Sequence, residues 1–276
     1  IKLNGSPYDR IIEHIGKLPL VLSTPYDSDL IREISEVRRK WVDGCIAQYN
    51  QEYLADLMVY NRILSQRNAL LKGMEGHLKA SNESLLDTYD TQLITLSKSL
   101  SHVRADFVDK FVPFLSANEG LIVFEHETCS MTYQSQILAG DFEHTFLESR
   151  KKDLLTLRTN VGSHKDDYSF LMDGQPLKKF GSQGQQKSFL IALRLSQYDY
   201  LAKATQTKPM LLLDDIFDKL DDERIGRLTD LLSDSARFGQ VFITDARKER
   251  SSLLMKGKHN AKIFEIENGK VNSYET

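Results

Sequence analysis

The sequence of 276 residues has few cysteines and no long apolar segment, and each absence excludes a class of protein. Its two cysteines, Cys45 and Cys129, are too few for a disulfide framework, so we expect buried thiols and a reducing, cytoplasmic setting. No apolar run approaches the ~20 residues that span a bilayer, and no secretory signal opens the sequence. These absences exclude a disulfide-rich secreted domain and favour a protein with no membrane partner.

The sequence also lacks an excess of positive charge. Its 36 Lys and Arg residues face 39 Asp and Glu residues, which gives a formal net charge of −3. This balance argues against a protein that binds nucleic acid over its whole surface, although a local basic patch is compatible with it. Hydrophobic residues at 41% and charged residues at 27% are typical of a globular chain with a sizeable core.

A phosphate-binding P-loop is the third absence. The segment Gly181–Ser188 nearly matches the pattern G-x-x-x-x-G-K-S/T, but Gln186 occupies the position of the second glycine. A half-charged segment, Leu177–Phe180, precedes it where a P-loop has a buried strand. No other stretch of the sequence matches, the His and Cys residues show no zinc spacing, and no Ser/His/Asp order stands out.

Residues from Asp29 to about Leu115 are predicted to be helical, because glycine is rare there and long side chains dominate. Two stretches repeat apolar residues at alternating steps of three and four, which places a seam on one face of each helix. The first seam is Leu54, Leu57, Asn61, Leu64, Asn68 and Leu71, and the second is Leu86, Tyr89, Leu93, Leu96, Leu100, Val103 and Phe107. Asn at two seam positions is predicted to weaken the first seam and fix its register. Together the stretches predict an antiparallel helical hairpin, either a projecting arm or a two-helix packing within a bundle.

Predicted strands and helices alternate beyond Pro113. The strands are predicted at 121–124, 168–172, 210–213 and 240–244, and the helices at 141–159, after Gly184 and through 225–232. Hairpins are predicted around Asp173-Gly174 and over 263–271. The first residues, Ile1 to Gly5, are typical of a strand that enters an Asn-Gly turn, so we expect further sequence ahead of Ile1. The alternation predicts an α/β layer with parallel strands.

The strongest chemical signal is the apolar run from Met210 to Leu213 that ends in Asp214 and Asp215. A continuous apolar run suits a strand buried on both faces, and open α/β sheets bind ligands at the carboxyl ends of their strands. In NTPases the first acid of such a pair helps to hold Mg²⁺ and its neighbour orients the attacking water. A structural pair or a helix cap is the alternative interpretation.

A second signal is Ser182-Gln183-Gly184-Gln185 at the start of a predicted helix. A helix start attracts phosphate through its free N–H groups and the positive end of its dipole, and a glycine there lets the backbone approach closely. On its own this segment is better explained as a serine N-cap. The Asp-Asp strand that follows, with Asp218 to Asp221 beyond it, makes the set more specific.

Candidate DNA contacts are local basic groups, each of which is alternatively a solvated face. They are Arg38-Arg39-Lys40, Arg62, Arg67, Lys72, Lys151-Lys152 and Lys178-Lys179. Such groups would bind the DNA backbone rather than read bases. The run His164-Lys165-Asp166-Asp167 is either a metal or catalytic cluster or the polar end of a strand.

In this order, the motifs resemble those of ABC-type ATPases of the SMC-like group, with a Ser-Gly-Gly-Gln-type motif, a Walker B strand and a D-loop. The whole sequence more closely resembles the RecF family of bacterial DNA replication and recombination-repair proteins. The shared segments are Lys2–Gly5, Arg38-Arg39, Gln66–Asn68, Gly162–Asp167, Ser182–Ser188, Leu212–Asp215, Leu220-Asp221 and Gln240–Thr244.

The resemblance implies an α/β fold, namely the C-terminal part of an ABC-type ATPase head with a mostly parallel sheet and an inserted helical hairpin arm. It implies a remnant of the N-terminal ATPase lobe at 1–28, a helical arm at 29–117 and the C-terminal ATPase lobe at 118–276. The cofactors it implies are ATP and Mg²⁺. The partners it implies are DNA at single-stranded gaps or junctions, a second copy in an ATP-dependent homodimer, and mediators of the RecR and RecO type.

Individual roles follow from the same resemblance. Asp214 would coordinate Mg²⁺, and Asp215 stands where most ABC ATPases carry a catalytic Glu. The Ser182–Gln185 segment would reach the γ-phosphate held by the dimer partner, and Asp221 would link the two sites. The implied activity is DNA repair, recombination and replication, linked to the SOS response, in which the dimer holds DNA and helps to load recombinase.

Three departures from the family pattern stand beside this interpretation. Gln183 replaces the first glycine of the usual pair, Asp245 stands near the position of a switch His, and the P-loop segment is absent from the 276 residues. We therefore expect this chain alone to hydrolyse no ATP. The alternatives are a degenerate, non-hydrolysing ABC-like scaffold that binds DNA or protein, and another SMC-like ATPase such as a nuclease-coupled defence protein.

Overall fold

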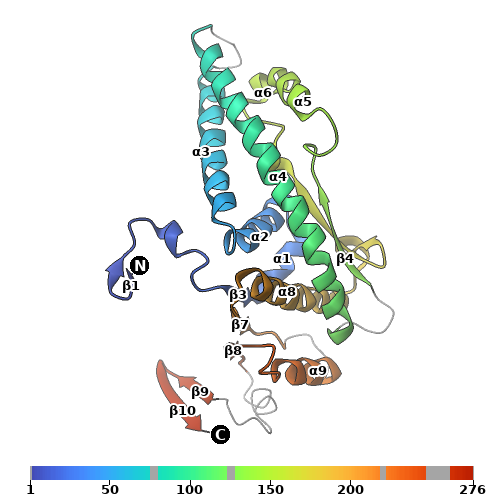
Figure 1. The fold of residues 1–276 in the computed structure, drawn as a ribbon. Helices are drawn as coiled ribbons and strands as arrows, with labels where there is room; N and C mark the ends of the chain where they lie inside the picture. Colours follow the sequence, from blue (N-terminus) through green and yellow to red (C-terminus); the bar gives the residue numbers. More distant parts are fainter. Residues whose placement is uncertain (1, 75–79, 123–127, 218–221, 247–261, 276) are drawn as a thin grey trace.

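The computed structural model describes residues 2–74, 80–122, 128–217, 222–246 and 262–275. A long helical arm rises above a central helix, and a small parallel sheet lies below that helix (Figure 1). The prediction of mixed helices and parallel strands is confirmed. The predicted residues Val123 and Phe124, and the segment from Asp218 to Asp221, lie outside the described residues.

The arm is a helical hairpin of α3 (Gln51–Gly73) and α4 (Ala80–Ile122), which lie side by side in Figure 1. The predicted seam of α4 is confirmed, because every second member, from Leu86 to Phe107, is fully buried. The seam predicted for α3 is partly wrong, because Asn61 is exposed. The residues that α3 buries most completely are Tyr53, Tyr60, Ile63, Arg67 and Leu71. The buried face of α3 is therefore shifted by about one position, toward residues that hydrogen-bond across the arm base.

An antiparallel sheet and several short helices pack against the base of the arm. The sheet is β4 (Cys129–Gln134), β5 (Asp167–Met172) and β6 (Gln175–Pro176), and the helices include α1 (Ser28–Arg32) and α2 (Ser35–Ala47). The strand predicted at 121–124 is wrong where it can be checked, because Leu121 and Ile122 end α4. Helix α4 continues through Pro113, which is exposed, and through the predicted boundary between residues 117 and 118.

The single helix predicted over 141–159 is two short helices, α5 (Phe142–Glu148) and α6 (Arg150–Thr156). Helix α6 ends at Leu157, whose φ of 55° and ψ of 31° are left-handed. A left-handed leucine interrupts the helical hydrogen-bond pattern, which is the physical reason that the helix stops before residue 159.

The parallel sheet has the order β3 (Leu20–Ser23), β7 (Met210–Asp214) and β8 (Val241–Thr244), with β7 in the centre. Helix α8 (Gln183–Thr205) lies between this sheet and the arm, and helix α9 (Asp222–Leu232) flanks the same layer. One side of α8, including Phe189 and Leu193, joins the core of the arm. Its other side, including Ile191 and Tyr198, joins the core of the parallel sheet. Helix α8 therefore connects the two cores, since it is apolar around most of its circumference.

Short elements complete the described chain. The strand and Asn-Gly turn predicted at the first residues are present, and they form a hairpin of β1 (Lys2–Leu3) with β2 (Ser6–Pro7). The hairpin predicted over 263–271 is confirmed as β9 (Lys262–Glu267) with β10 (Lys270–Glu275). The remaining elements are α7 (Leu177–Phe180) and the 3₁₀ helices η1 (Ile11–His14), η2 (Pro25–Asp27) and η3 (Ser163–Lys165). Across the described ranges, we find no helix with the length and apolarity needed to cross a membrane.

Candidate nucleotide site and basic surface

Asp214 is the last residue of the central strand β7, and its side chain is exposed at the carboxyl edge of the sheet. The hydroxyl group of Thr244, at the end of the adjacent strand β8, donates a hydrogen bond to the Asp214 carboxylate. The next residue, Asp215, has a left-handed φ of 49°, and its N–H donates to the Thr244 carbonyl oxygen at 3.1 Å. The two acids therefore lie at the carboxyl edge of the sheet, where open α/β sheets bind their ligands.

The chemistry of this sheet edge fits a hard divalent cation. Carboxylate and hydroxyl oxygens are suitable donors for Mg²⁺, which usually takes only one or two carboxylates and completes its shell with water and phosphate. Within the described ranges, no group of three or more His, Cys, Asp or Glu side chains is arranged to enclose a metal ion. A metal at Asp214 would therefore depend on a bound phosphate for part of its coordination.

Ser182 caps the start of helix α8 and faces solvent. Its hydroxyl group accepts a hydrogen bond from the Gln185 N–H at 3.2 Å, while the Gln185 side chain accepts one from the Ser182 N–H at 2.7 Å. This reciprocal capping box fixes the first turn of the helix. The capping box engages the backbone N–H of Gln185, the third helical residue. The backbone N–H groups of Gln183 and Gly184 therefore have no partner inside the helix. The serine N-cap that the sequence suggested as an alternative is present, and it is compatible with phosphate binding.

Gly184 and Gln186 fix the position of this helix start against its neighbours. A Cβ atom on Gly184 would lie 3.2 Å from Nη1 of Arg224, a residue of α9. Gln186 donates to the Gly181 carbonyl at 3.1 Å and accepts from Arg32 of α1 at 3.4 Å. Glycine at 184 therefore allows α9 to pack closely on the first turn of α8.

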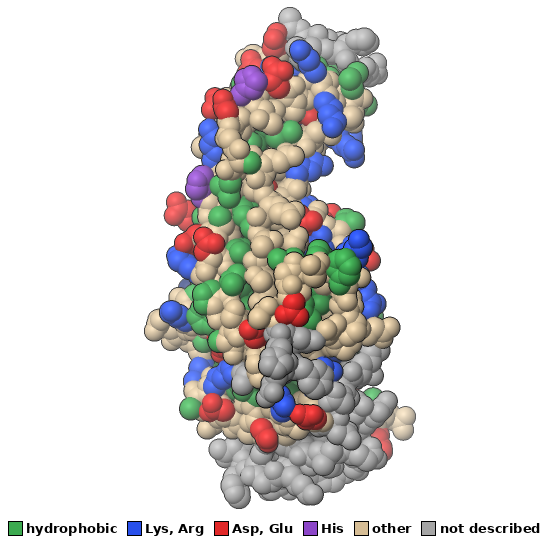
Figure 2. Space-filling view, turned by 90° about the vertical axis from the view of Figure 1, so that its right-hand side faces the viewer, with side chains coloured by type: hydrophobic (Ala, Val, Ile, Leu, Met, Phe, Trp, Pro, Cys, Tyr) green, Lys and Arg blue, Asp and Glu red, His purple; other side chains and the backbone are tan. Residues whose placement is uncertain are grey.

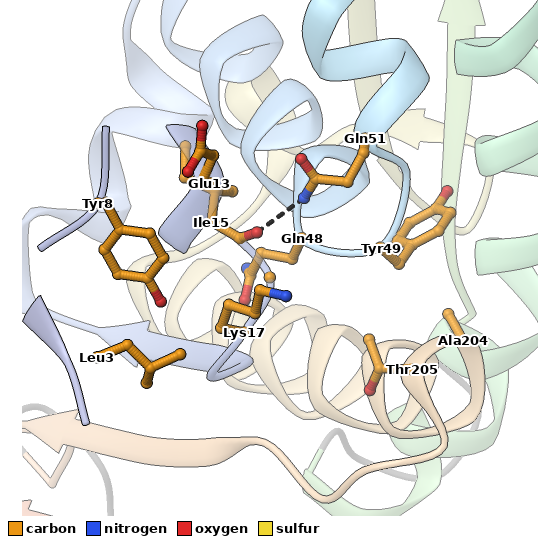
Figure 3. A pocket seen from close by; sticks show the side chains of 11 residues that line it. Leu3, Tyr8, Glu13, Ile15, Lys17, Gln48, Tyr49, Gln51, Ala204 and Thr205 are labelled. Atoms are coloured by element: carbon orange, nitrogen blue, oxygen red, sulfur yellow. Dashed lines mark hydrogen bonds between the residues drawn. The ribbon is translucent and has the colours of Figure 1, made fainter. Parts of the chain in front are cut away.

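A pocket of about 660 Å³ lies at the other end of α8, where Ala204 and Thr205 line it (Figure 3). The rest of the pocket wall comes from the N-terminal segment and from the turn between α2 and α3. The Gln51 side chain connects these two parts of the wall, because it donates a hydrogen bond to the Ile15 carbonyl oxygen at 2.7 Å. Because Ser182 caps the opposite end of the same helix, this pocket is separate from the candidate phosphate site.

The run from His164 to Asp167 is a structural joint at the base of the arm. His164 lies in the 3₁₀ helix η3 rather than on a strand, and its Nδ1 is 2.7 Å from the Tyr60 hydroxyl oxygen. Burial lowers the pKa of His164 to about 4, so its imidazole is neutral at physiological pH. Asp166 is buried and accepts from Arg104 of α4 at 3.0 Å. This arrangement agrees with the polar strand end that the sequence offered as an alternative.

The structure contradicts DNA contacts at two of the predicted arginines. Arg67 is 0% exposed, pairs with Asp90 at 2.6 Å and Asp153 at 2.7 Å, and links both arm helices to α6. Arg38 is 8% exposed and donates to the Asp167 carboxylate at 2.8 Å. A DNA phosphate cannot reach either guanidinium group, because both are enclosed by partners inside the protein.

The other basic candidates remain accessible. Lys151 and Lys152 are exposed on α6, and Arg39 is partly exposed on α2. The structure adds two residues that the sequence did not single out for DNA, Arg158 and Lys165, both exposed. Partial burial, and next the positive charges of Arg158 and Arg39, lower the pKa of Lys165. We call Arg39, Lys151, Lys152, Arg158 and Lys165 the basic surface. In the sequence, only their positive charge pointed to Arg158 and Lys165, because neither residue lies in the same helix as Lys151 and Lys152.

Comparison with known proteins places the chain among close relatives. No family model matches it. It is 43% identical over 271 residues to the DNA replication and repair protein RecF of Cytophaga hutchinsonii, covering 98% of this chain and 71% of that protein. It is 42% identical over 267 residues to the RecF protein of Flavobacterium johnsoniae, covering 96% of this chain and 74% of that protein.

Solved structures agree with these sequence matches. The structure of the recombination mediator protein RecF-ATPrS in the RecFOR pathway matches with a TM-score of 0.83 and 28% identity, over 99% of this chain and 72% of that one. The corresponding RecF-ATP structure matches with a TM-score of 0.81 and 28% identity. The predicted fold, the ABC-type ATPase head with an inserted helical arm, is thereby confirmed.

Proposed function

Because the chain belongs to the RecF family of DNA replication and repair proteins, we propose that it acts in recombination and repair as an ATP-dependent dimer that holds DNA. Each ATP would be shared between two copies, so that nucleotide binding and dimerisation are one linked equilibrium. Hydrolysis would release the DNA. The single observation that carries this proposal is the placement of Asp214 at the end of the central strand while the Ser182 helix start faces solvent.

On the nucleotide side, the carboxylate of Asp214 would hold Mg²⁺, which neutralises charge on the phosphates when bound. Asp215 would orient the attacking water. The outward-facing segment of Ser182, Gln183, Gly184 and Gln185 would bind the γ-phosphate of the nucleotide carried by the other copy. By the family resemblance, Asp221 would link the two nucleotide sites. An exposed helix start can serve a partner in this way because its orphan N–H groups point away from its own core.

On the DNA side, the basic surface would contact the phosphate backbone. Figure 2 shows Lys and Arg side chains gathered on the upper part of one face, beside a hollow in the outline of the molecule. This view is the right-hand side of Figure 1, where α5 and α6 lie. Arg39, Lys151 and Lys152 would position DNA without reading its sequence, and binding would weaken as salt rises.

We also propose the wider context that the family suggests. The chain would help to load recombinase at single-stranded gaps together with RecR- and RecO-type mediators. Residues 1–28 would belong to the N-terminal ATPase lobe, 29–117 to the arm and 118–276 to the C-terminal lobe. The buried cores follow a different division: the core of the arm also contains Met131, Phe146 and Phe170 of the proposed C-terminal lobe, and the core of the parallel sheet contains Val21.

Dimerisation is the direct test. Ser182→Arg, in the protein at its full encoded length, would place a bulky side chain at the phosphate contact and is expected to abolish the dimer that we propose forms with ATP and Mg²⁺. Ser116→Arg, at an exposed position of α4, is the matched control and should leave the dimer unchanged. Sedimentation velocity with and without nucleotide measures both. A wild-type protein whose association is unaffected by ATP would refute the proposal.

The departures at Gln183 and Asp215 favour a second candidate function, a non-hydrolysing scaffold that binds DNA or protein. The same dimer would then form with ATP but would not turn it over. For the 276-residue chain alone we expect no ATP hydrolysis in either case, because its sequence contains no P-loop. Turnover by this chain that Asp215→Asn abolishes would contradict that expectation.

A further inference from the structure

Leu155 on helix α6 is 81% exposed, more than any other large apolar side chain among the residues described. A single exposed leucine needs no explanation by itself. This one, however, lies two residues before Leu157, whose left-handed φ of 55° is unfavourable for a bulky side chain. An exposed apolar group and a strained backbone therefore occur at the same turn.

The position of Leu155 is held rigidly by buried contacts on the opposite side of α6. Asp153, two residues earlier, is 0% exposed and accepts from Arg67 at 2.7 Å. The Arg158 N–H donates to the Asp153 carbonyl at 3.2 Å, and the Asn160 N–H donates to the Asp153 carboxylate at 3.0 Å. These bonds fix both ends of the strained turn, so the leucine projects from a rigid support.

Positive charge surrounds this leucine. Lys151 and Lys152 precede it by four and three residues, the spacings that share one face of a helix. Arg158 follows it, and the Lys165 side chain is close enough for the charges of Arg158 and Lys152 to lower its pKa. None of these four side chains forms an ion pair with any residue that the structure describes. The negative charge of Asp153, which is paired with Arg67, opposes this lowering of the Lys165 pKa. The site is therefore an exposed apolar side chain beside cations that have no ion-pair partner among the described residues.

A partner that matches this surface must be a polyanion that also exposes apolar area. Continuous duplex DNA offers phosphates, but its bases are stacked inside. DNA with unpaired bases offers both phosphates and the faces of its bases, and leucine side chains are among those that proteins place against unstacked base steps.

We propose that Leu155 contacts unpaired or unstacked bases while the basic surface holds the adjoining backbone, so that this turn discriminates gapped DNA from continuous duplex. The inference rests on the proposed DNA-binding function and adds to it the residue that provides the discrimination. A protein with an acidic surface is the competing partner, and the experiment below distinguishes it.

The test uses the protein at its full encoded length with ATP and Mg²⁺, and two DNA probes of equal length. One is a closed duplex without ends, and the other carries a single-stranded gap. Leu155→Ala should weaken binding to the gapped probe by about fivefold or more, the size expected when the apolar area of one leucine side chain is no longer buried, and leave duplex binding unchanged. Leu18→Ala, at another exposed leucine, is the matched control and should change neither. Fluorescence anisotropy measures the affinity of the wild type and of both variants for each probe.

A second readout reports the contact itself. A 2-aminopurine base in the gap should become brighter when the wild-type protein unstacks it, and this gain should be lost in Leu155→Ala. The double variant Lys151→Ala/Lys152→Ala should weaken both probes to a similar extent, because phosphate contacts are present in each.

These variants separate the two levels of the proposal. If the lysine variant weakens both probes while Leu155→Ala changes neither, or changes both equally, the leucine inference is overturned and DNA binding by this surface stands. If the lysine variant also changes neither probe, DNA binding by this surface is refuted. The inference about Leu155 is then refuted as well, and the result favours an acidic protein as the partner of this surface.

Discussion

The arm region and the parallel-sheet region use their charged residues in opposite ways. Along the arm, Arg67, Asp153 and Asp166 are almost completely buried. Arg67 donates a hydrogen bond to Asp153, and Arg104 donates one to Asp166. At the edge of the parallel sheet, Asp214 is exposed and has a hydroxyl group beside it. Charges that are buried and paired fix geometry, whereas an exposed charge is available to a ligand. The comparison explains why the most charged segments of the sequence were weaker guides to function than the apolar strand that ends in two acids.

The largest expected effect is on the arm. Arg67→Ala would leave Asp153 buried without its cation, because Arg67 pairs with this carboxylate at 2.7 Å. Asp90, which pairs with Arg67 at 2.6 Å, would keep only its ion pair with Arg150. We expect a loss of about 3–5 kcal/mol in the free energy of unfolding, measured by urea denaturation. Arg62→Ala, at an exposed position of the same helix, should cost less than about 0.5 kcal/mol. Equal effects of the two substitutions would remove the contrast between the regions.

The next largest effect is a pH dependence of stability, and it arises at His164, which contacts Tyr60 of the arm helix α3. The pKa of His164 is lowered from 6.5 to about 4 by burial, so the unfolded chain binds a proton in this range that the folded chain does not. The full stabilisation is therefore present above pH ~6.5 and is lost as the pH falls toward 4, by roughly 3 kcal/mol in total. His164→Gln should flatten the unfolding free energy between these values. A variant with the same slope as the wild type would contradict the assignment to His164.

The smallest of the three effects on free energy concerns catalysis at the sheet edge. In the protein at its full encoded length, Asp215→Asn should lower ATP turnover by roughly 100-fold, since an amide orients and activates water less well than a carboxylate. The unfolding free energy should change little, because the side chain is only partly buried. Asp230→Asn, on the exposed side of α9, serves as the control in a phosphate-release assay. Unchanged turnover in Asp215→Asn would favour the scaffold function.

Local patterns predicted the elements that carry their own periodicity. The leucine steps of α4, the apolar run of β7 and the Ser182 cap of α8 each depend on residues within one segment, and each is found where it was expected. The strand β4 was missed although Cys129, Met131 and Tyr133 alternate with polar residues, and its partner residues in β5 lie 33 to 43 positions further along the chain. The break before residue 159 was missed because a left-handed leucine has no distinctive sequence signal.

The candidate site divides in the same way. The two acids and the serine-capped helix were visible in the sequence, but Thr244 was not, because its bond to Asp214 exists only once β8 lies beside β7 in parallel register. Arg67 and Arg38 looked like surface cations by composition. Only the packing of α6 and β5 against the arm shows that they are enclosed.

The sequence by itself determined which segments are helical, where the central strand ends and which residues cap α8, since these depend on side-chain spacing and backbone chemistry along a few turns. The tertiary structure decided which charges are free to meet a ligand. Whether an arginine binds DNA or a buried aspartate depends on what the chain brings against it from dozens of residues away, and no local pattern contains that information.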